Sequence, residues 1–120
     1  AKAVQIGTRF VVAKESIVHQ NYKDRLIKAK DIDATVTGRS HGHPIRSLRN
    51  QMTRDYLKME EEGATLEELE KITLGALRNA VIDGDIKRGT VMAGLVKEEL
   101  SCKEIIDEMM TECRRLMKEA

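Results

Sequence analysis

Tryptophan is absent from this 120-residue chain, and aromatic residues make up only 2% of it. Large rings usually contribute much of the packing area of a core, so a core here must be built from Leu, Ile, Val and the six Met residues. The length is that of one domain, which can bury roughly two-thirds of its unfolded surface. A low content of aromatic side chains is typical of a helical layer whose main packing partner lies elsewhere. A small all-α domain is an alternative.

The chain also lacks an excess of one charge and a long apolar run. Its 21 basic residues are balanced by 20 acidic ones, which disfavours nucleic acid and anionic membranes as partners. No apolar run approaches the roughly 20 residues that span a bilayer, so we expect no membrane partner.

Only two cysteines are present, Cys102 and Cys113. On one predicted helix they lie about 16 Å apart along the axis, too far for a disulfide. Two unpaired thiols favour a reducing, cytoplasmic location, and the expected role of both is that of small buried apolar side chains.

Two short strands are predicted. Residues 3–6 are apolar and β-compatible and end at Gly7-Thr8, which indicates a buried strand followed by a tight loop. Residues 32–37 alternate with period two. Two short strands do not form a stable sheet alone, and an apolar strand of this kind is usually buried on both faces. We therefore expect the chain to be part of a longer protein.

Helical spacing covers most of the remainder. Helical pieces are expected between residues 10 and 30, with an interruption at 19–21. A helix is expected from Ile45, after the loop that holds the single proline, to Gly63, which terminates it.

Two further helices begin at capping boxes, in which a hydroxyl and a carboxylate three residues apart satisfy each other's backbone amides. Thr65 and Glu68 start a helix that runs to Asp83-Gly84, and Ser101 and Glu104 start the terminal amphipathic helix. A Gly-flanked apolar loop, residues 86–96, lies between them.

Gly7-Thr8 is the first candidate for chemistry. A glycine lets backbone amides approach an anion, a following helix contributes positive potential, and the Thr hydroxyl is a further donor. An ordinary tight turn explains the same residues, and the motif alone favours it.

Other clusters of polar residues are less specific. His41 and His43 have no third ligand nearby to complete a metal site, so a structural loop is expected and no metal is assigned. The glutamates at 60–62 have no partner for acid–base work and indicate the solvated end of a helix.

The ordered motifs of the chain resemble one enzyme family. Residues 3–16 are similar to the eighth barrel strand and the following segment of the FMN-dependent enoyl-acyl carrier protein reductase II family, and more loosely to the related nitronate monooxygenases. The likeness continues, in the same order, through five stretches: Thr37-Gly38-Arg39, Gly42-His43-Pro44-Ile45-Arg46, Leu77-Arg78-Asn79-Ala80-Val81, Asp83-Gly84-Asp85 and Gly89-Thr90-Val91-Met92-Ala93-Gly94.

The resemblance implies an α/β fold: the C-terminal segment of a (β/α)₈ TIM barrel, comprising the last barrel strand and the helices after it, and mostly α with two short strands when taken alone. Residues 1–31 would hold that strand, the FMN-phosphate loop and the next helix. Residues 32–120 would form a strand, loop and helical extension of the same domain. Phosphate commonly binds at the loops after strands seven and eight of such barrels.

The resemblance also implies cofactors and partners. Gln5, Ile6, Gly7 and Thr8 would hold the FMN phosphate, and NAD(P)H would supply the hydride that reduces an enoyl group on acyl carrier protein. The remainder of the barrel and a second copy, as a homodimer, are the implied protein partners.

The basic run Arg39, Arg46, Arg49 and Arg54 is open to three interpretations. A solvated helix face is the plainest. Nucleic-acid binding is disfavoured because few aromatics interleave the run. Reception of the acidic carrier protein or of a nicotinamide phosphate is a third, since arginine suits bidentate recognition of phosphate.

The chain departs from the family in two respects. The family's active-site histidine lies upstream, and none of His19, His41 and His43 corresponds to it, so no catalytic residue is assigned and the segment alone is expected to be inactive. About four residues are also missing after Gly94. A nitronate monooxygenase and a non-catalytic helical interaction module are the alternatives.

Overall fold

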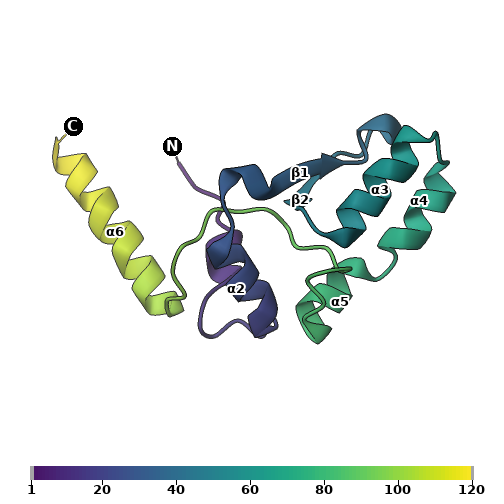
Figure 1. Cartoon of the computed structure of the whole chain (residues 1–120). Coiled ribbons are helices and arrows are strands. Elements are labelled where there is room, and N and C mark those ends of the chain that lie inside the picture. Colours follow the sequence, from purple (N-terminus) through teal and green to yellow (C-terminus); the bar gives the residue numbers. More distant parts are fainter. Residues whose placement is uncertain (1, 120) are drawn as a thin grey trace.

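The fold, seen in a computed structural model that describes residues 2–119, is an elongated arrangement of helices around one small hairpin (Figure 1). Its extents are 55 × 31 × 22 Å. The elements in chain order are α1 (Thr8–Val11), α2 (Gln20–Lys28), η1 (Asp31–Asp33), β1 (Ala34–Thr37), η2 (Arg39–His41), β2 (Ile45–Leu48), α3 (Gln51–Glu61), α4 (Leu66–Thr73), α5 (Ala76–Asp83) and α6 (Cys102–Glu119).

The hairpin pairs β1 and β2 in antiparallel register, with Ala34 opposite Leu48 and Thr37 opposite Ile45. The segment after α5 runs along the free edge of β2. There the amide of Leu48 donates to the Val91 carbonyl at 2.8 Å, and the Ala93 amide donates to the Arg46 carbonyl at 3.2 Å. These bonds satisfy an edge that would otherwise expose unpaired backbone groups.

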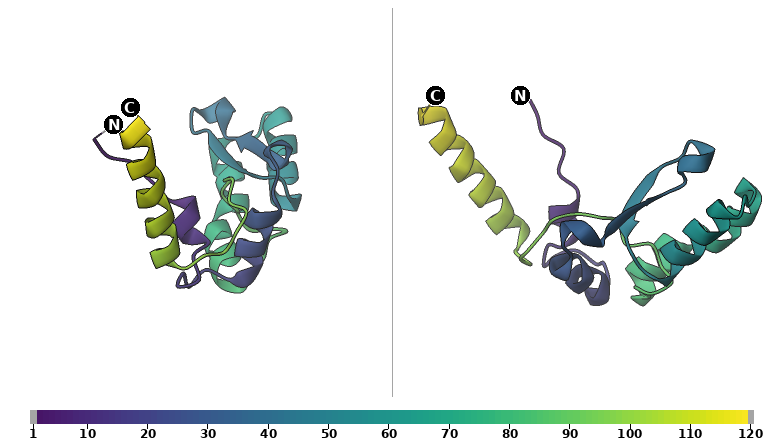
Figure 2. Two further views of the ribbon diagram at one scale, coloured as in Figure 1. Left: turned by 90° about the vertical axis from the view of Figure 1, so that its left-hand side faces the viewer. Right: turned by 45° about the horizontal axis from the view of Figure 1, so that its top comes forward.

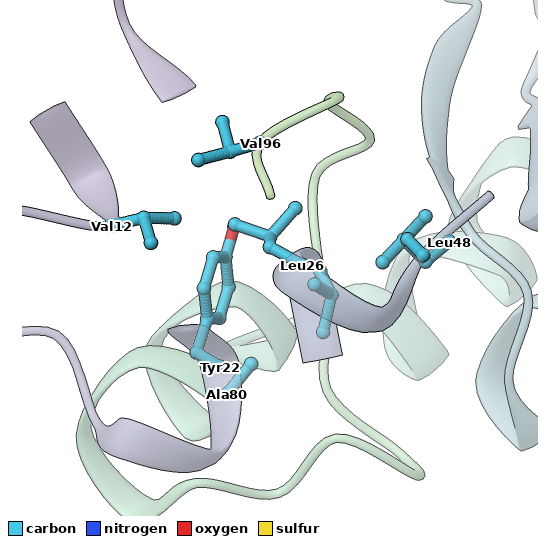
Figure 3. Packing of buried hydrophobic residues seen from close by; sticks show 8 residues of the cluster. Val12, Tyr22, Leu26, Leu48, Ala80 and Val96 are labelled. Carbon is cyan, nitrogen blue, oxygen red and sulfur yellow. The ribbon is translucent and has the colours of Figure 1, made fainter. Parts of the chain in front are cut away.

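The larger apolar core gathers residues from five separate segments of the chain (Figure 3). Tyr22 and Leu26 of α2 lie at its centre, 3% and 1% exposed. The other buried members are Val12, Ala29, Leu48, Ala80, Val91 and Val96. Tyr22 also accepts a hydrogen bond from the Met92 amide at 3.0 Å, so the one large ring in this core satisfies its polar atom.

A second, smaller core joins α3 to α4 through Met52, Tyr56 and Leu69. The turn between these helices contains Gly63 in the left-handed conformation, with φ of 83°. Thr65 then caps α4 by accepting from the Glu68 amide at 3.3 Å. The expected end of α3 and the expected start of α4 are therefore confirmed.

Helix α6 projects from the body beside the N-terminal segment, and the views in Figure 2 show little of the rest of the chain against its outer half. Its start is confirmed as a capping box, because the Ser101 amide donates to Glu104 and the Glu104 amide donates to Ser101, both at 3.1 Å. The Glu15 carboxylate accepts from the Cys102 amide at 3.0 Å. That hydrogen bond holds the pKa of Glu15 below its usual value, although burial opposes the shift.

The first predicted strand, residues 3–6, is wrong as a description of this chain, because the segment carries no strand pairing within residues 2–119. Val4 is 77% exposed. Strand structure requires a neighbour to take up its backbone hydrogen bonds, and no other described strand pairs with this segment. The residues at 3–5 instead stand open to solvent.

Three helix boundaries also differ from the expectation. Ile45–Leu48 is strand β2 and not the first turn of a helix, because it pairs with β1 on one edge and contacts residues 91–93 on the other. The expected helix from Leu66 to Asp83 is broken into α4 and α5 at Gly75, whose φ is 73°. The first interruption is longer and lies earlier than the expected residues 19–21, since α1 ends at Val11 and α2 begins at Gln20.

The thiols do not pack as expected either. Cys102 is half-buried and Cys113 is exposed, and neither is in a disulfide. Among the helices of residues 2–119, none has the length and apolar character needed to cross a membrane.

A buried lysine of α2 links the segment after α1 to the segment that precedes α6. The side chain of Lys23 is 4% exposed, and its ammonium donates to the Ala13 carbonyl at 2.8 Å and to the Glu99 carboxylate at 3.2 Å. A buried charge is tolerated only when it is paired in this way. Gln20 donates to Glu99 as well, at 3.0 Å, and with Lys23 it lowers the pKa of that carboxyl group.

Candidate functional site

The predicted phosphate loop, Gln5 to Thr8, leads from the exposed N-terminal segment directly into α1. Gln5 and Gly7 are exposed, and Ile6 and Thr8 are half-buried. The Gly7 carbonyl closes the first turn by accepting from the amides of Phe10 and Val11 at 3.0 and 3.1 Å. The amides of Thr8 and Arg9 precede that turn and make no hydrogen bond within residues 2–119. Two backbone donors are therefore available beside the Thr8 hydroxyl.

Gly7 is not required by the local backbone. Its φ of −109° and ψ of −64° are accessible to any residue, and a Cβ placed there would meet no atom within 4 Å. Neither strain nor packing inside this chain explains the absence of a side chain. The open space next to the free amides of Thr8 and Arg9 is what close approach of an anion requires.

The structure brings Gly94 against this loop. A Cβ at Gly94 would overlap the Thr8 methyl group and would lie 2.8 Å from the Thr8 hydroxyl oxygen. Because Gly94 has no side chain, segment 89–94 can pack directly against the side chain of Thr8. The sequence did not predict this contact, because the two residues are 86 positions apart.

Loop 38–43, between β1 and β2, is held by a residue that the sequence reasoning had placed in solvent. The Glu60 carboxylate accepts from the amides of Gly38 and Ser40, at 2.9 and 3.3 Å, and from the Ser40 hydroxyl. His41 is within 3.3 Å of the Ala64 carbonyl. Glu60 is therefore a clamp on the histidine-containing loop, and the expectation that it is only the solvated end of a helix is wrong.

The hydrogen bonds from loop 38–43 to the Glu60 carboxylate are expected to be lost in acid. Burial raises the pKa of Glu60, but the hydrogen bonds from Ser40 and Gly38, together with the charge of His41, outweigh burial and lower it. A carboxyl group with a lowered folded-state pKa contributes stability above its unfolded pKa, and this contribution is lost as the pH falls through the folded pKa. NMR shifts of the Gly38 and Ser40 amides should therefore move on acidification below the ordinary range of glutamate.

The control is Glu61, the exposed neighbour on the same helix. Glu60→Gln should abolish the acid transition of the two amides, whereas Glu61→Gln should leave it in place. An unchanged transition in Glu60→Gln would show that another group holds the loop.

The four arginines of the basic run do not form one cluster. Arg46 lines a pocket with Lys30 near β1, whereas Arg54 lines a different pocket with Arg25 and Lys87. Arg39 and Arg49 are exposed and line neither of these pockets. A single docking face built from all four is therefore not what the fold presents.

Residues 1–112 match the family profile described as nitronate monooxygenase, and the chain belongs to this family. It is 22% identical, over 116 residues, to a probable nitronate monooxygenase of Bacillus subtilis. Among solved structures it resembles FabK from Thermotoga maritima, with 40% sequence identity and a TM-score of 0.89 over 99% of this chain. A mutant of that FabK gives 36% identity and a TM-score of 0.80, also over 99% of the chain.

The chain spans only part of each relative. It covers 33% of the Bacillus subtilis protein, 39% of the Thermotoga maritima FabK chain and 36% of the mutant chain. The small α-rich body with one antiparallel hairpin is therefore similar to a portion of larger proteins. The resemblance to the family that the sequence motifs indicated is confirmed.

Proposed function

We propose that this chain is part of a flavin-dependent oxidoreductase, in which Gln5, Ile6, Gly7 and Thr8 hold the phosphate of FMN. The observation that carries the proposal is the open space at Gly7 beside two amides, at the start of α1, that make no hydrogen bond among residues 2–119. Membership of the nitronate monooxygenase family supports the flavin. The amides of Thr8 and Arg9 and the Thr8 hydroxyl donate to the phosphate, and Gly94 keeps that hydroxyl in place.

The reaction is reduction of an enoyl thioester on acyl carrier protein. The motif resemblance to the enoyl-acyl carrier protein reductase II family and the 40% identity to FabK favour it. Bound FMN supplies hydride transfer from NAD(P)H to the double bond. This chain contributes binding and orientation of the cofactor, because none of its histidines corresponds to the family's active-site residue.

Residues 1–31 contribute the last strand of a (β/α)₈ barrel with its phosphate loop and helix, and residues 32–120 are an extension of the same domain. A core shared by both ranges supports a single domain, since Val12 and Leu26 pack with Leu48 and Val91. The two unpaired thiols favour action in the cytoplasm. The family resemblance favours a homodimer.

The remainder of the barrel covers an apolar groove between the N-terminal segment and α6. The groove has a volume of about 1000 Å³ and is lined by Val4 and Ile6 on one side and by α6 on the other. Met110 is 45% exposed there, and Met117 is 73% exposed. Exposed apolar surface of this extent indicates a packing partner, and the unpaired backbone of residues 3–6 can add to a sheet.

The proposal is tested by measurements on the whole protein that contains this chain. The purified protein should carry flavin and oxidise NAD(P)H when an enoyl thioester is added. Oxygen consumption with a nitronate, and none with the thioester, would instead favour a nitronate monooxygenase, which the family match also supports. A colourless protein without either activity would contradict both and favour a helical interaction module.

A further inference from the structure

We propose that a second anion site, separate from the loop at Gly7, lies between α2, α3 and the turn that follows α5, and that it binds a phosphate-bearing small molecule. The site is a pocket of about 460 Å³. Its lining contains four cationic side chains from three parts of the chain, namely Arg25, Arg54, Lys87 and Arg88. We call it the basic pocket.

The frame of the basic pocket is fixed by hydrogen bonds. Asn50, which is 8% exposed, donates through its side-chain amide to the carbonyls of Ile86 and Gly89 at 3.0 and 2.6 Å. The Met52 amide donates to the Lys87 carbonyl at 3.2 Å. The turn that carries Lys87 and Arg88 is thereby attached to the start of α3, so the cations are presented by a preorganised backbone.

The positive charge of the basic pocket is not neutralised by the part of the chain that the structure describes. No Asp or Glu lines it, and none of its four cations takes part in an ion pair formed by residues 2–119. Neighbouring carboxylates accept hydrogen bonds from uncharged donors instead. Asp85 accepts from the backbone amides of Lys87 and Arg88 at 3.2 and 3.0 Å, and Asp55 accepts from the side chain of Gln51 at 2.8 Å.

Several like charges around one concavity repel each other unless an anion joins them. A phosphate group carries up to two negative charges at neutral pH and several acceptor oxygens, and the planar guanidinium groups of Arg25, Arg54 and Arg88 can each donate two parallel hydrogen bonds to it. The cations line a concave pocket and not a broad flat surface, which favours a small ligand over an acidic protein. None of Gln5, Ile6, Gly7 and Thr8 lines the pocket.

Titration of the chain with sodium pyrophosphate, followed by NMR, tests the inference. The amides of Arg54, Lys87 and Arg88 should shift in a saturable manner. The double variant Arg54→Gln/Arg88→Gln should weaken binding by about tenfold or more, because charge-assisted hydrogen bonds are the strong ones. The matched double variant Lys58→Gln/Arg114→Gln removes the same charge from exposed positions outside the pocket and should change binding by less than about twofold.

Equal weakening by the two double variants would overturn the proposal in favour of diffuse electrostatic attraction. Absence of pyrophosphate binding, with shifts at the same amides on addition of a poly-glutamate peptide, would overturn it in favour of an acidic protein partner. Thermal unfolding of each variant shows that it is folded. NMR shifts of the Gly7 and Thr8 amides report binding at the proposed FMN loop separately. Either proposal can therefore be rejected without the other.

Discussion

Replacing Asn50 with alanine is expected to lower the free energy of unfolding by about 3 kcal/mol, the largest stability effect of a single side chain that we predict. Asn50 caps α3 by accepting from the Thr53 amide at 3.0 Å. It also donates to the Ile86 and Gly89 carbonyls. Truncation loses the cap and leaves two carbonyls without their donor, the buried one of Gly89 and the partly buried one of Ile86. A buried group left unpaired costs about 1–3 kcal/mol.

Thr65 provides a matched control, because it caps α4 through the Glu68 amide and is exposed. Thr65→Ala removes a cap only and should cost about 1 kcal/mol. Urea unfolding of the two variants, compared at equal m-values, gives the contribution of the two carbonyl bonds as the difference. Equal costs would contradict the view that Asn50 joins the 85–89 turn to α3.

Replacing Thr8 with valine in the whole protein is expected to weaken FMN binding by about 10- to 100-fold, because a hydrogen bond to a charged group contributes about 1.5–3 kcal/mol. The substitution keeps the shape of the side chain that contacts Gly94 and removes only the hydroxyl donor. Thr35→Val in β1 makes the same chemical change outside the predicted phosphate loop and should leave FMN affinity unaltered. Fluorescence titration of the apoprotein with FMN measures both.

Gly7→Ala separates ligand contact from folding. A Cβ at Gly7 meets no atom of this chain within 4 Å, so the isolated chain should keep its thermal stability. The added methyl group would stand where the phosphate approaches, so FMN affinity of the whole protein should fall. Unchanged FMN affinity in both Gly7→Ala and Thr8→Val would refute the proposal that this loop holds the FMN phosphate. The same titration would still detect flavin that is bound through other residues.

The isolated 120 residues should bind FMN weakly or not at all, since one loop does not replace contacts to the flavin ring. Stoichiometric, tight uptake by this chain would contradict that expectation.

Local chemistry allowed several features to be predicted from the sequence. The caps at Thr65 and Ser101, and the stop at Gly63, depend on residues within one turn of each other, and the structure confirms these helix ends. The full box forms at Ser101, whereas at Thr65 the described residues show only the bond from the Glu68 amide to the Thr65 hydroxyl. The Asn50 cap was missed, although Asn is a preferred N-cap residue and stands just before the helically spaced apolar residues Met52 and Tyr56. The ordered motifs from Gly7 to Gly94 identified the family.

Tertiary structure alone decided the rest. Ile45–Leu48 has the spacing of a helix, yet pairing with β1 and contact with residues 91–93 make it a strand, because backbone hydrogen bonds to distant segments override weak local preference. The same dependence leaves residues 3–6 unpaired, since a strand forms only beside a partner. The contact of Gly94 with Thr8 and the gathering of Arg25, Arg54, Lys87 and Arg88 are likewise invisible along the sequence. The sequence by itself therefore determined the family and the helix ends at Gly63, Thr65 and Ser101. Three-dimensional packing determined the other helix boundaries and which distant residues share a site.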